Sequence, residues 1–198
     1  MVLLLLRAAS GEPAHGSGVN LLQADASYLR LDAPASRIIT LAPHLAELAH
    51  AAGASDKLIA TVAFSEYPAS VRDLPRIGDA FRLDIERIVT LDPDLVIAWD
   101  SGNPRAAIQQ LTALGIPVWS VEIRAPQEIA STVEALGGAA GTTQVAARTA
   151  QALRQRMESL SATYGGATLQ SYFYQVDSRP LFTVSGRHLI SQGLALCG

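Results

Sequence analysis

The chain has 198 residues, of which 49% are apolar and 17% charged, and its formal net charge is −3. A chain of this length and composition can bury a substantial core. The small negative charge excludes the extended basic surface that phosphate backbones require, so we expect no nucleic-acid partner. The single cysteine excludes an internal disulfide and a cysteine-rich metal site.

The first twenty residues show few signals of regular structure. Residues 1–6 form an apolar run that is shorter than the hydrophobic region of a complete secretory signal. Residues 8–20 are rich in glycine, serine and proline and lack periodicity. We therefore expect residues 1–20 to be a leader or a signal remnant. No later stretch is long and apolar enough to cross a bilayer as a helix.

From residue 37 onward, short apolar runs alternate with helical patterns. Strands are expected over 38–41, 58–63, 95–99 and 118–121, and helices over 45–52, 85–89 and 106–114. Strands that are apolar along their whole length are typical of a parallel sheet covered by helices on both faces. Residues 21–125 are thus predicted to form an α/β lobe with a Rossmann-like parallel sheet.

The helix over 85–89 has clear boundary signals. Asp84 can cap its first turn, and Pro93 disfavours helical geometry in the residue before it. The helical spacing predicts that Ile85, Ile88 and Val89 face inward. Glu86 and Arg87 are then left toward solvent.

Two further helices are expected between residues 126 and 166. The first runs from 126 to about 136, and the glycine-rich stretch 137–141 is expected to break it. The second, over 143–164, has apolar residues at spacings of three and four and a length of about 30 Å. A new strand over 172–176 then begins what we expect to be an incomplete second α/β lobe, over 167–198.

A set of short motifs resembles the cobalamin-binding periplasmic proteins, which belong to the helical-linker class of ABC transporter solute-binding proteins. The resemblance spans residues 22–198 and is most specific over 83–103. It implies two α/β lobes joined by one long helix, with the ligand held between them. The motifs are RIITLAP at 37–43, EL at 47–48, AG at 52–53, FSEYP at 64–68, IERIV at 85–89, PDLVIAW at 93–99 and SG at 185–186.

The resemblance also implies a ligand and a set of contacts. The ligand is a cobalamin or related corrinoid, which is transported and is not a cofactor, and no metal site or catalytic residue is implied. Ligands of open parallel sheets bind outside the carboxyl ends of the strands, and a flat macrocycle suits aromatic surfaces. Phe81 stands where the family places a second pocket tryptophan. The expected contacts are Pro43, His44, Phe64, Tyr67, Phe81, Trp99 and Asn103.

Partners and location follow from the same resemblance. Glu86 is implied to dock onto arginines of the membrane permease, a charge-assisted contact suited to recognition. The resemblance further implies a periplasmic protein, which we expect to be a monomer. Arg82 and Arg187 are additional candidates for polar ligand contacts.

Two alternatives remain open at this stage. A siderophore or haem binder of the same class would use more basic or tyrosine-rich edges of the pocket. A small α/β enzyme is the alternative from a different class, but His44 and His50 lie about 240° apart around a helix and do not share a face. No nucleophile elbow surrounds Ser185, and the glycines at 137–141 match no nucleotide-binding motif.

Overall fold

The computed structural model describes residues 18–168 and 170–196, so most of the expected leader and Cys197 lie outside the described residues. The lobe contains a parallel sheet in the order β4-β3-β5-β6. Its strands are β3 (Ile38–Thr40), β4 (Leu58–Ala60), β5 (Leu95–Trp99) and β6 (Val118–Val121). The predicted parallel α/β lobe is confirmed.

Helices cover both faces of the sheet. Ile38 and Ile39 are both fully buried, yet they belong to different core clusters, because successive side chains of a strand point to opposite faces. On one face the sheet packs against α1 (Pro43–Ala51) and α4 (Pro126–Ala140). The other face packs against α2 (Ile85–Thr90) and α3 (Arg105–Ala113). Two short 3-10 turns, η1 (Ser55–Lys57) and η2 (Ala69–Val71), flank β4.

Helix α2 is capped as expected, but fewer of its side chains are buried than its sequence pattern predicts. The Arg87 backbone N–H donates to Asp84 Oδ1 at 3.0 Å, which confirms the cap. Ile88 is fully buried, whereas Val89 is 44% exposed, so its predicted inward orientation is wrong. The helix has only six residues, fewer than two turns, so it can bury only a narrow stripe against the sheet.

An antiparallel hairpin precedes the sheet and was not expected from the sequence. It pairs β1 (Val19–Leu22) with β2 (Tyr28–Leu31), and it begins inside the segment assigned to the leader. Leu21 and Leu31 enter the core beside α4. The turn is attached to β6, because the Ala24 backbone N–H donates to the Ser120 carbonyl at 3.0 Å.

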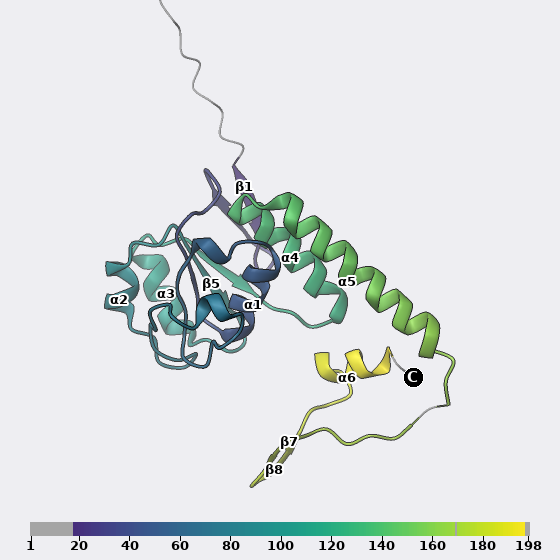
Figure 1. Ribbon diagram of the computed structural model, residues 1–198. Coiled ribbons are helices and arrows are strands. Elements are labelled where there is room, and N and C mark those ends of the chain that lie inside the picture. The colour runs from purple at the N-terminus through teal and green to yellow at the C-terminus, as the bar shows by residue number, and fades with distance from the viewer. Residues whose placement is uncertain (1–17, 169, 197–198) are drawn as a thin grey trace, which may run out of the picture.

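Helices α4 and α5 (Thr143–Tyr164) form a tight antiparallel elbow (Figure 1). The bounds of α5 agree with the prediction, but the expected break at 137–141 is wrong, because α4 continues to Ala140 and only Gly141 adopts a left-handed conformation. Gly137 is buried, and a Cβ placed there would lie 2.2 Å from the Ala146 Cβ. The glycine is therefore a point of close helix approach and not a helix breaker.

Two polar contacts attach the elbow to the rest of the lobe. The Lys57 ammonium donates to the Ala140 carbonyl at the end of α4. The Thr142 hydroxyl donates to the Ala52 carbonyl at 2.7 Å, which joins the elbow to the end of α1. These contacts satisfy carbonyls at two helix ends and fix the direction in which α5 leaves the lobe.

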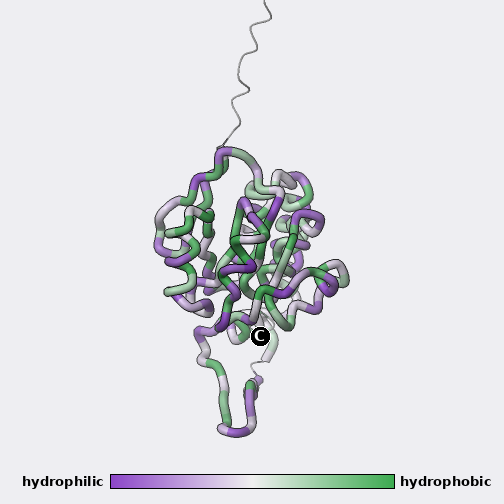
Figure 2. The backbone as a smooth tube through the Cα atoms, turned by 90° about the vertical axis from the view of Figure 1, so that its left-hand side faces the viewer, coloured by the Kyte–Doolittle hydropathy of each residue, from purple (hydrophilic) through white to green (hydrophobic). Residues whose placement is uncertain are grey.

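The segment after α5 projects away from the lobe and returns to it (Figures 1 and 2). It contains an antiparallel hairpin of β7 (Gln175–Ser178) and β8 (Leu181–Thr183), then α6 (Leu189–Ala195). The strand predicted over 172–176 is shifted, because the partner strand β8 reaches only back to Gln175. The Gln192 side chain donates to the Arg124 carbonyl at 2.7 Å, which returns α6 to the lobe. None of the helices among the described residues is long and apolar enough to span a membrane.

Candidate functional site

The strand order places a topological switch point between β3 and β5. The chain moves outward to β4 on one side of β3 and to β6 on the other side of β5. In an open parallel sheet the crevice for a ligand lies outside the carboxyl ends of the strands at this point. Pro43 and His44 follow β3, while Trp99 ends β5 and Asn103 follows it. Four of the seven expected contact residues therefore lie where the topology opens the sheet.

His44 and Trp99 are in contact at the switch point. Their rings meet edge to face at a right angle, with centroids 5.3 Å apart. Both side chains are half-buried. Burial lowers the pKa of the His44 imidazole, and the Glu122 carboxylate opposes part of this shift. The site thus favours a neutral imidazole against the indole.

Gly102 allows the Trp99 ring to lie close to the backbone. A Cβ at this position would lie 1.9 Å from the nearest indole atom, so any larger residue would push the ring away. The indole is therefore bordered by His44 on one side and by the Gly102 backbone on another.

The loop after β4 presents two aromatic side chains to solvent. Phe64 is 81% exposed and Tyr67 is 62% exposed. Phe64 has a φ of 67°, an uncommon and strained conformation for a bulky side chain. Arg76 supports the loop from beneath, because its guanidinium donates to the Ser65 carbonyl at 2.9 Å and to three other carbonyls nearby. The loop thus exposes two aromatic side chains to solvent instead of burying them.

A third exposed aromatic, Phe81, lies at the tip of the next loop and is 74% exposed. The Asp79 carboxylate accepts the backbone N–H groups of Phe81 and Arg82, both at 2.8 Å. This local turn fixes the backbone at the tip while leaving the Phe81 ring free. Arg82 is exposed beside it, whereas Arg187 lies far along the chain, before α6.

Asn103 lies beneath this surface. It is 7% exposed, and its amide makes three hydrogen bonds within the protein. It accepts from the Trp99 backbone N–H and donates to the carbonyls of Leu41 and Ala80. The hydrogen-bonding groups of this side chain are therefore already paired with backbone groups of the surrounding loops.

Sequence reasoning missed the supporting residues. Arg76, Asp79 and Glu122 each bind backbone groups of a loop that carries an expected contact residue or lies next to one. A buried chain of hydroxyls, Thr40 to Thr61 to Ser65, also links β3 to the loop after β4, with both distances 2.9 Å. An aspartate two residues before Phe81 was a readable turn signal. Glu122 and Thr40 bind partners 21 residues away, and the hydrogen bonds of Arg76 to nearby carbonyls follow no recognised sequence motif.

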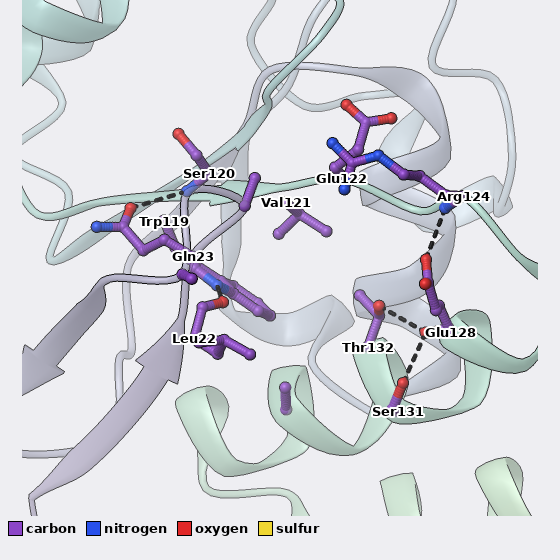
Figure 3. Close-up of a pocket in the computed structure, with 13 residues that line it drawn as sticks. Leu22, Gln23, Trp119, Ser120, Val121, Glu122, Arg124, Glu128, Ser131 and Thr132 are labelled. Atoms are coloured by element: carbon purple, nitrogen blue, oxygen red, sulfur yellow. Dashed lines mark hydrogen bonds between the residues drawn. The ribbon is translucent and has the colours of Figure 1, made fainter.

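A cavity of about 450 Å³ lies to one side of this surface, between the β1–β2 hairpin, β6 and α4 (Figure 3). Its polar walls include Gln23, Glu122 and Arg124. Many of these groups already have partners: Gln23 accepts the Ser120 backbone N–H, and Glu128 accepts that of Arg124. The residues expected to contact the ligand do not line this cavity.

Glu86 lies apart from the crevice, exposed on α2 at the outer layer of the lobe. Its carboxylate has no hydrogen bond or ion pair to the described residues. Among those residues, no group of three or more histidine, cysteine, aspartate or glutamate side chains could hold a metal ion.

The fold combines a parallel α/β lobe, with candidate contacts at its switch point, and a long helix that continues from the lobe, which is a ligand-binding α/β architecture. The model of the family described as periplasmic binding protein matches residues 38–180. The chain belongs to this family.

Individual proteins that are similar to this chain are also binding proteins by name. The vitamin B12-binding protein of Vibrio cholerae serotype O1 is 38% identical over 172 residues, which cover 87% of this chain and 62% of the relative. The crystal structure of the periplasmic vitamin B12 binding protein BtuF of Vibrio cholerae is similar, with a TM-score of 0.78, 39% identity, and coverage of 83% and 65% of the two chains. The periplasmic haem binding protein HutB of Vibrio cholerae has a TM-score of 0.58 and 31% identity, over 65% of this chain and 50% of its own. This chain thus spans less than two thirds of the length of the relatives that it matches.

Proposed function

We propose that this chain provides one wall of a corrinoid site in the solute-binding component of an ABC importer. The observation that carries the proposal is the exposure of three aromatic side chains, Phe64, Tyr67 and Phe81, on the loops between β4 and α2, together with the half-buried Trp99 at the end of β5. Exposed apolar patches of this kind mark binding surfaces, and aromatic rings offer large apolar area to a flat macrocycle. Relatives named vitamin B12-binding proteins support the choice of ligand.

In this proposal the corrinoid is cargo, and the protein binds and releases it without bond chemistry. Pro43, His44 and Trp99 contact it at the switch point, while the loops of Phe64 and Phe81 contact it from the side of β4. The residues from 167 onward begin a second lobe, and α4 and α5 (residues 126–166) link it to the first. The protein acts as a periplasmic monomer.

Glu86 is proposed to dock the lobe onto the importer's permease. It stands on the outer face of α2, exposed and without an intramolecular ion pair among the described residues. An exposed carboxylate of this kind can form a charge-assisted contact with a partner arginine without disturbing the ligand surface.

Titration of the chain with cyanocobalamin, haemin and a ferric siderophore tests the proposal. We expect cyanocobalamin to bind, as measured by absorbance changes and by calorimetry, and the other two ligands to bind more weakly. Haemin is the important comparison, because HutB is a haem binding protein by name. Preferential binding of haemin would support a haem binder instead, and the absence of binding to any corrinoid would exclude the proposed function.

Alanine substitution of Phe64, Tyr67 or Phe81 locates the surface. Each is expected to weaken cyanocobalamin binding roughly tenfold or more, because loss of a buried aromatic contact costs more than about 1.4 kcal/mol. Tyr28→Ala is the matched control, since Tyr28 is 68% exposed on the β1–β2 hairpin and lies outside the site. Equal affinities for all four variants would contradict the assignment.

A further inference from the structure

Asn103 joins three separate loops at the carboxyl edge of the sheet. Its Oδ1 accepts the Trp99 backbone N–H at 2.7 Å. Its Nδ2 donates to the Leu41 carbonyl at 2.9 Å and to the Ala80 carbonyl at 3.0 Å. Both amide hydrogens and the amide oxygen therefore take part in hydrogen bonds. All three bonds join the side chain to backbone groups, and none belongs to the hydrogen-bond pattern of a helix or a sheet.

Each of these partners either belongs to the proposed ligand surface, as Trp99 does, or lies close in the sequence to a residue of that surface. Leu41 lies shortly before Pro43 and His44, and Ala80 directly precedes Phe81. Trp99 is held at both of its backbone groups, because the Asn103 backbone N–H also donates to the Trp99 carbonyl at 2.9 Å. One buried amide therefore sets the relative positions of three segments that are far apart in the sequence.

We infer that Asn103 is a positioning residue of the binding surface, and that it acts on the ligand through His44, Phe81 and Trp99 without contacting it. The inference rests on the proposed function. Its physical basis is preorganisation: contact residues that are already held in their binding positions lose less conformational entropy when the ligand binds. A side chain that is 7% exposed and fully hydrogen-bonded can supply this order but offers little surface of its own.

Neither aspartate nor serine at position 103 can make the same three hydrogen bonds. Two carbonyl oxygens, of Leu41 and Ala80, face the same nitrogen, so the position requires two donors on one atom together with an acceptor for Trp99. Asn103→Asp keeps the shape and the acceptor but directs an oxygen at both carbonyls. Asn103→Ser is too short to reach all three partners. Either change is expected to release the loops of Pro43 and Phe81 from the turn of Trp99.

Affinity and stability are compared in one series. At a temperature well below the unfolding midpoint, Asn103→Ser is expected to weaken cyanocobalamin binding by roughly tenfold to a hundredfold, with Asn103→Asp as the second variant if the first does not fold. Leu111→Ala is the control, because Leu111 is fully buried on α3 in the core cluster of the opposite sheet face, which does not include Trp99. If Leu111→Ala and Asn103→Ser lower the midpoint and neither lowers the affinity, Asn103 is structural only and the inference is wrong.

A second measurement needs no ligand. The protein has two tryptophans, so in Trp119→Phe all tryptophan emission comes from Trp99. Adding Asn103→Ser to this variant is expected to shift the Trp99 emission to longer wavelength and to increase its quenching by acrylamide, whereas adding Leu111→Ala, in the other core cluster, leaves both unchanged. Unchanged emission in the Asn103 variant would overturn the inference. Failure of the parent chain to bind cyanocobalamin would instead refute the proposed function and leave this measurement decisive for the positioning role.

Discussion

The imidazole of His44 stands perpendicular to the indole of Trp99, 5.3 Å from it, at the point where the chain reverses its direction across the sheet. The contact joins the first turn of α1 to the end of β5. It also removes much of the imidazole from water, which is the main reason that the pKa of His44 is lowered. The protonation of His44 therefore bears on the packing of Trp99 at the crevice.

We expect His44 to make the folded protein less stable in mild acid. The folded state favours the neutral imidazole, so as the pH falls below the ordinary value of 6.5 the unfolded chain binds more protons. Stability that is fully present above this value is therefore lost as the pH falls through the pKa of the folded state. Urea unfolding at about pH 7.5 and about pH 5 measures the loss.

His44→Gln should remove this part of the pH dependence. His50→Gln is the control, because it removes a second histidine from the same helix, which is exposed but also has local contacts with the Ser55 hydroxyl and the Tyr67 ring. An identical pH dependence of unfolding in wild type and His44→Gln would contradict the prediction.

Phe64→Gly is expected to stabilise the fold while weakening ligand binding. Glycine adopts the positive φ of 67° without a steric cost, whereas phenylalanine is strained there. The gain should be up to about 1 kcal/mol, because the flexibility of glycine in the unfolded chain offsets part of the relieved strain. Thermal unfolding and cyanocobalamin titration measure the two effects.

Phe64→Ala separates the ring from the backbone. Alanine retains the Cβ and hence the strain, so this variant should lose affinity as Phe64→Gly does and gain no stability. A gain in stability as large as that of Phe64→Gly would show that the backbone of residue 64 is not strained.

Two adjacent glycines of α4 should respond in opposite ways to the same substitution. Gly137→Ala places a Cβ 2.2 Å from the Ala146 Cβ, so α4 and α5 must separate, at a cost of about 1–3 kcal/mol. Gly138→Ala meets nothing closer than 3.9 Å and should stabilise the helix by about 0.5–1 kcal/mol. Chemical denaturation of both variants measures the difference, and equal stabilities would show that the helices are not closely packed at Gly137.

Glu86→Arg should abolish docking and leave the lobe intact. The side chain is exposed on a short outer helix, so its charge reversal is expected to change stability by less than about 0.5 kcal/mol and not to change cyanocobalamin affinity. Binding to a vitamin B12 permease reconstituted in vesicles measures the loss. Glu47→Arg, which reverses an exposed charge on α1, is the matched control. Equal losses for both variants would mean that net charge, and not a specific contact at Glu86, governs association.

The ion pair between Glu134 and Arg154 should contribute little despite its geometry. The two bonds are 2.7 and 2.6 Å long and join α4 to α5, but both side chains are about two fifths exposed. A double-mutant cycle with Glu134→Gln and Arg154→Met is expected to give a coupling of at most about 1 kcal/mol. The hydrogen bond to Arg154 lowers the pKa of Glu134, so this contribution is present at neutral pH and is lost as the pH falls through the lowered pKa.

The sequence was most informative where local chemistry decides the structure. The bounds of β5 were predicted to the residue, because an uninterrupted apolar run follows Pro93. Those of α5 were also predicted, from apolar spacings that begin after a glycine. The positions of Pro43 and Trp99 after strands followed from the same alternation of elements, so the approximate place of the candidate site was predictable.

Long-range contacts account for what the sequence did not reveal. Gly137 lies within α4 because α5 packs against it, and no local signal shows that approach. The partners of Asn103 include Leu41, 62 residues away, and Ala80, 23 residues away, so its place beneath the surface could not be derived from spacing. The β1–β2 hairpin showed alternation, but its core contacts depend on α4.

Helix α5 is held against α4 over more than its first half. Gly137 and Ala146 bring the two helices together near the turn, and the Glu134–Arg154 ion pair joins them again further along. Residues 155–164 therefore extend only about 15 Å beyond the last of these contacts. A rotation of about 5° at Arg154 would move the end of the helix by only about 1 Å, so α5 holds whatever follows it at a nearly fixed distance from the lobe.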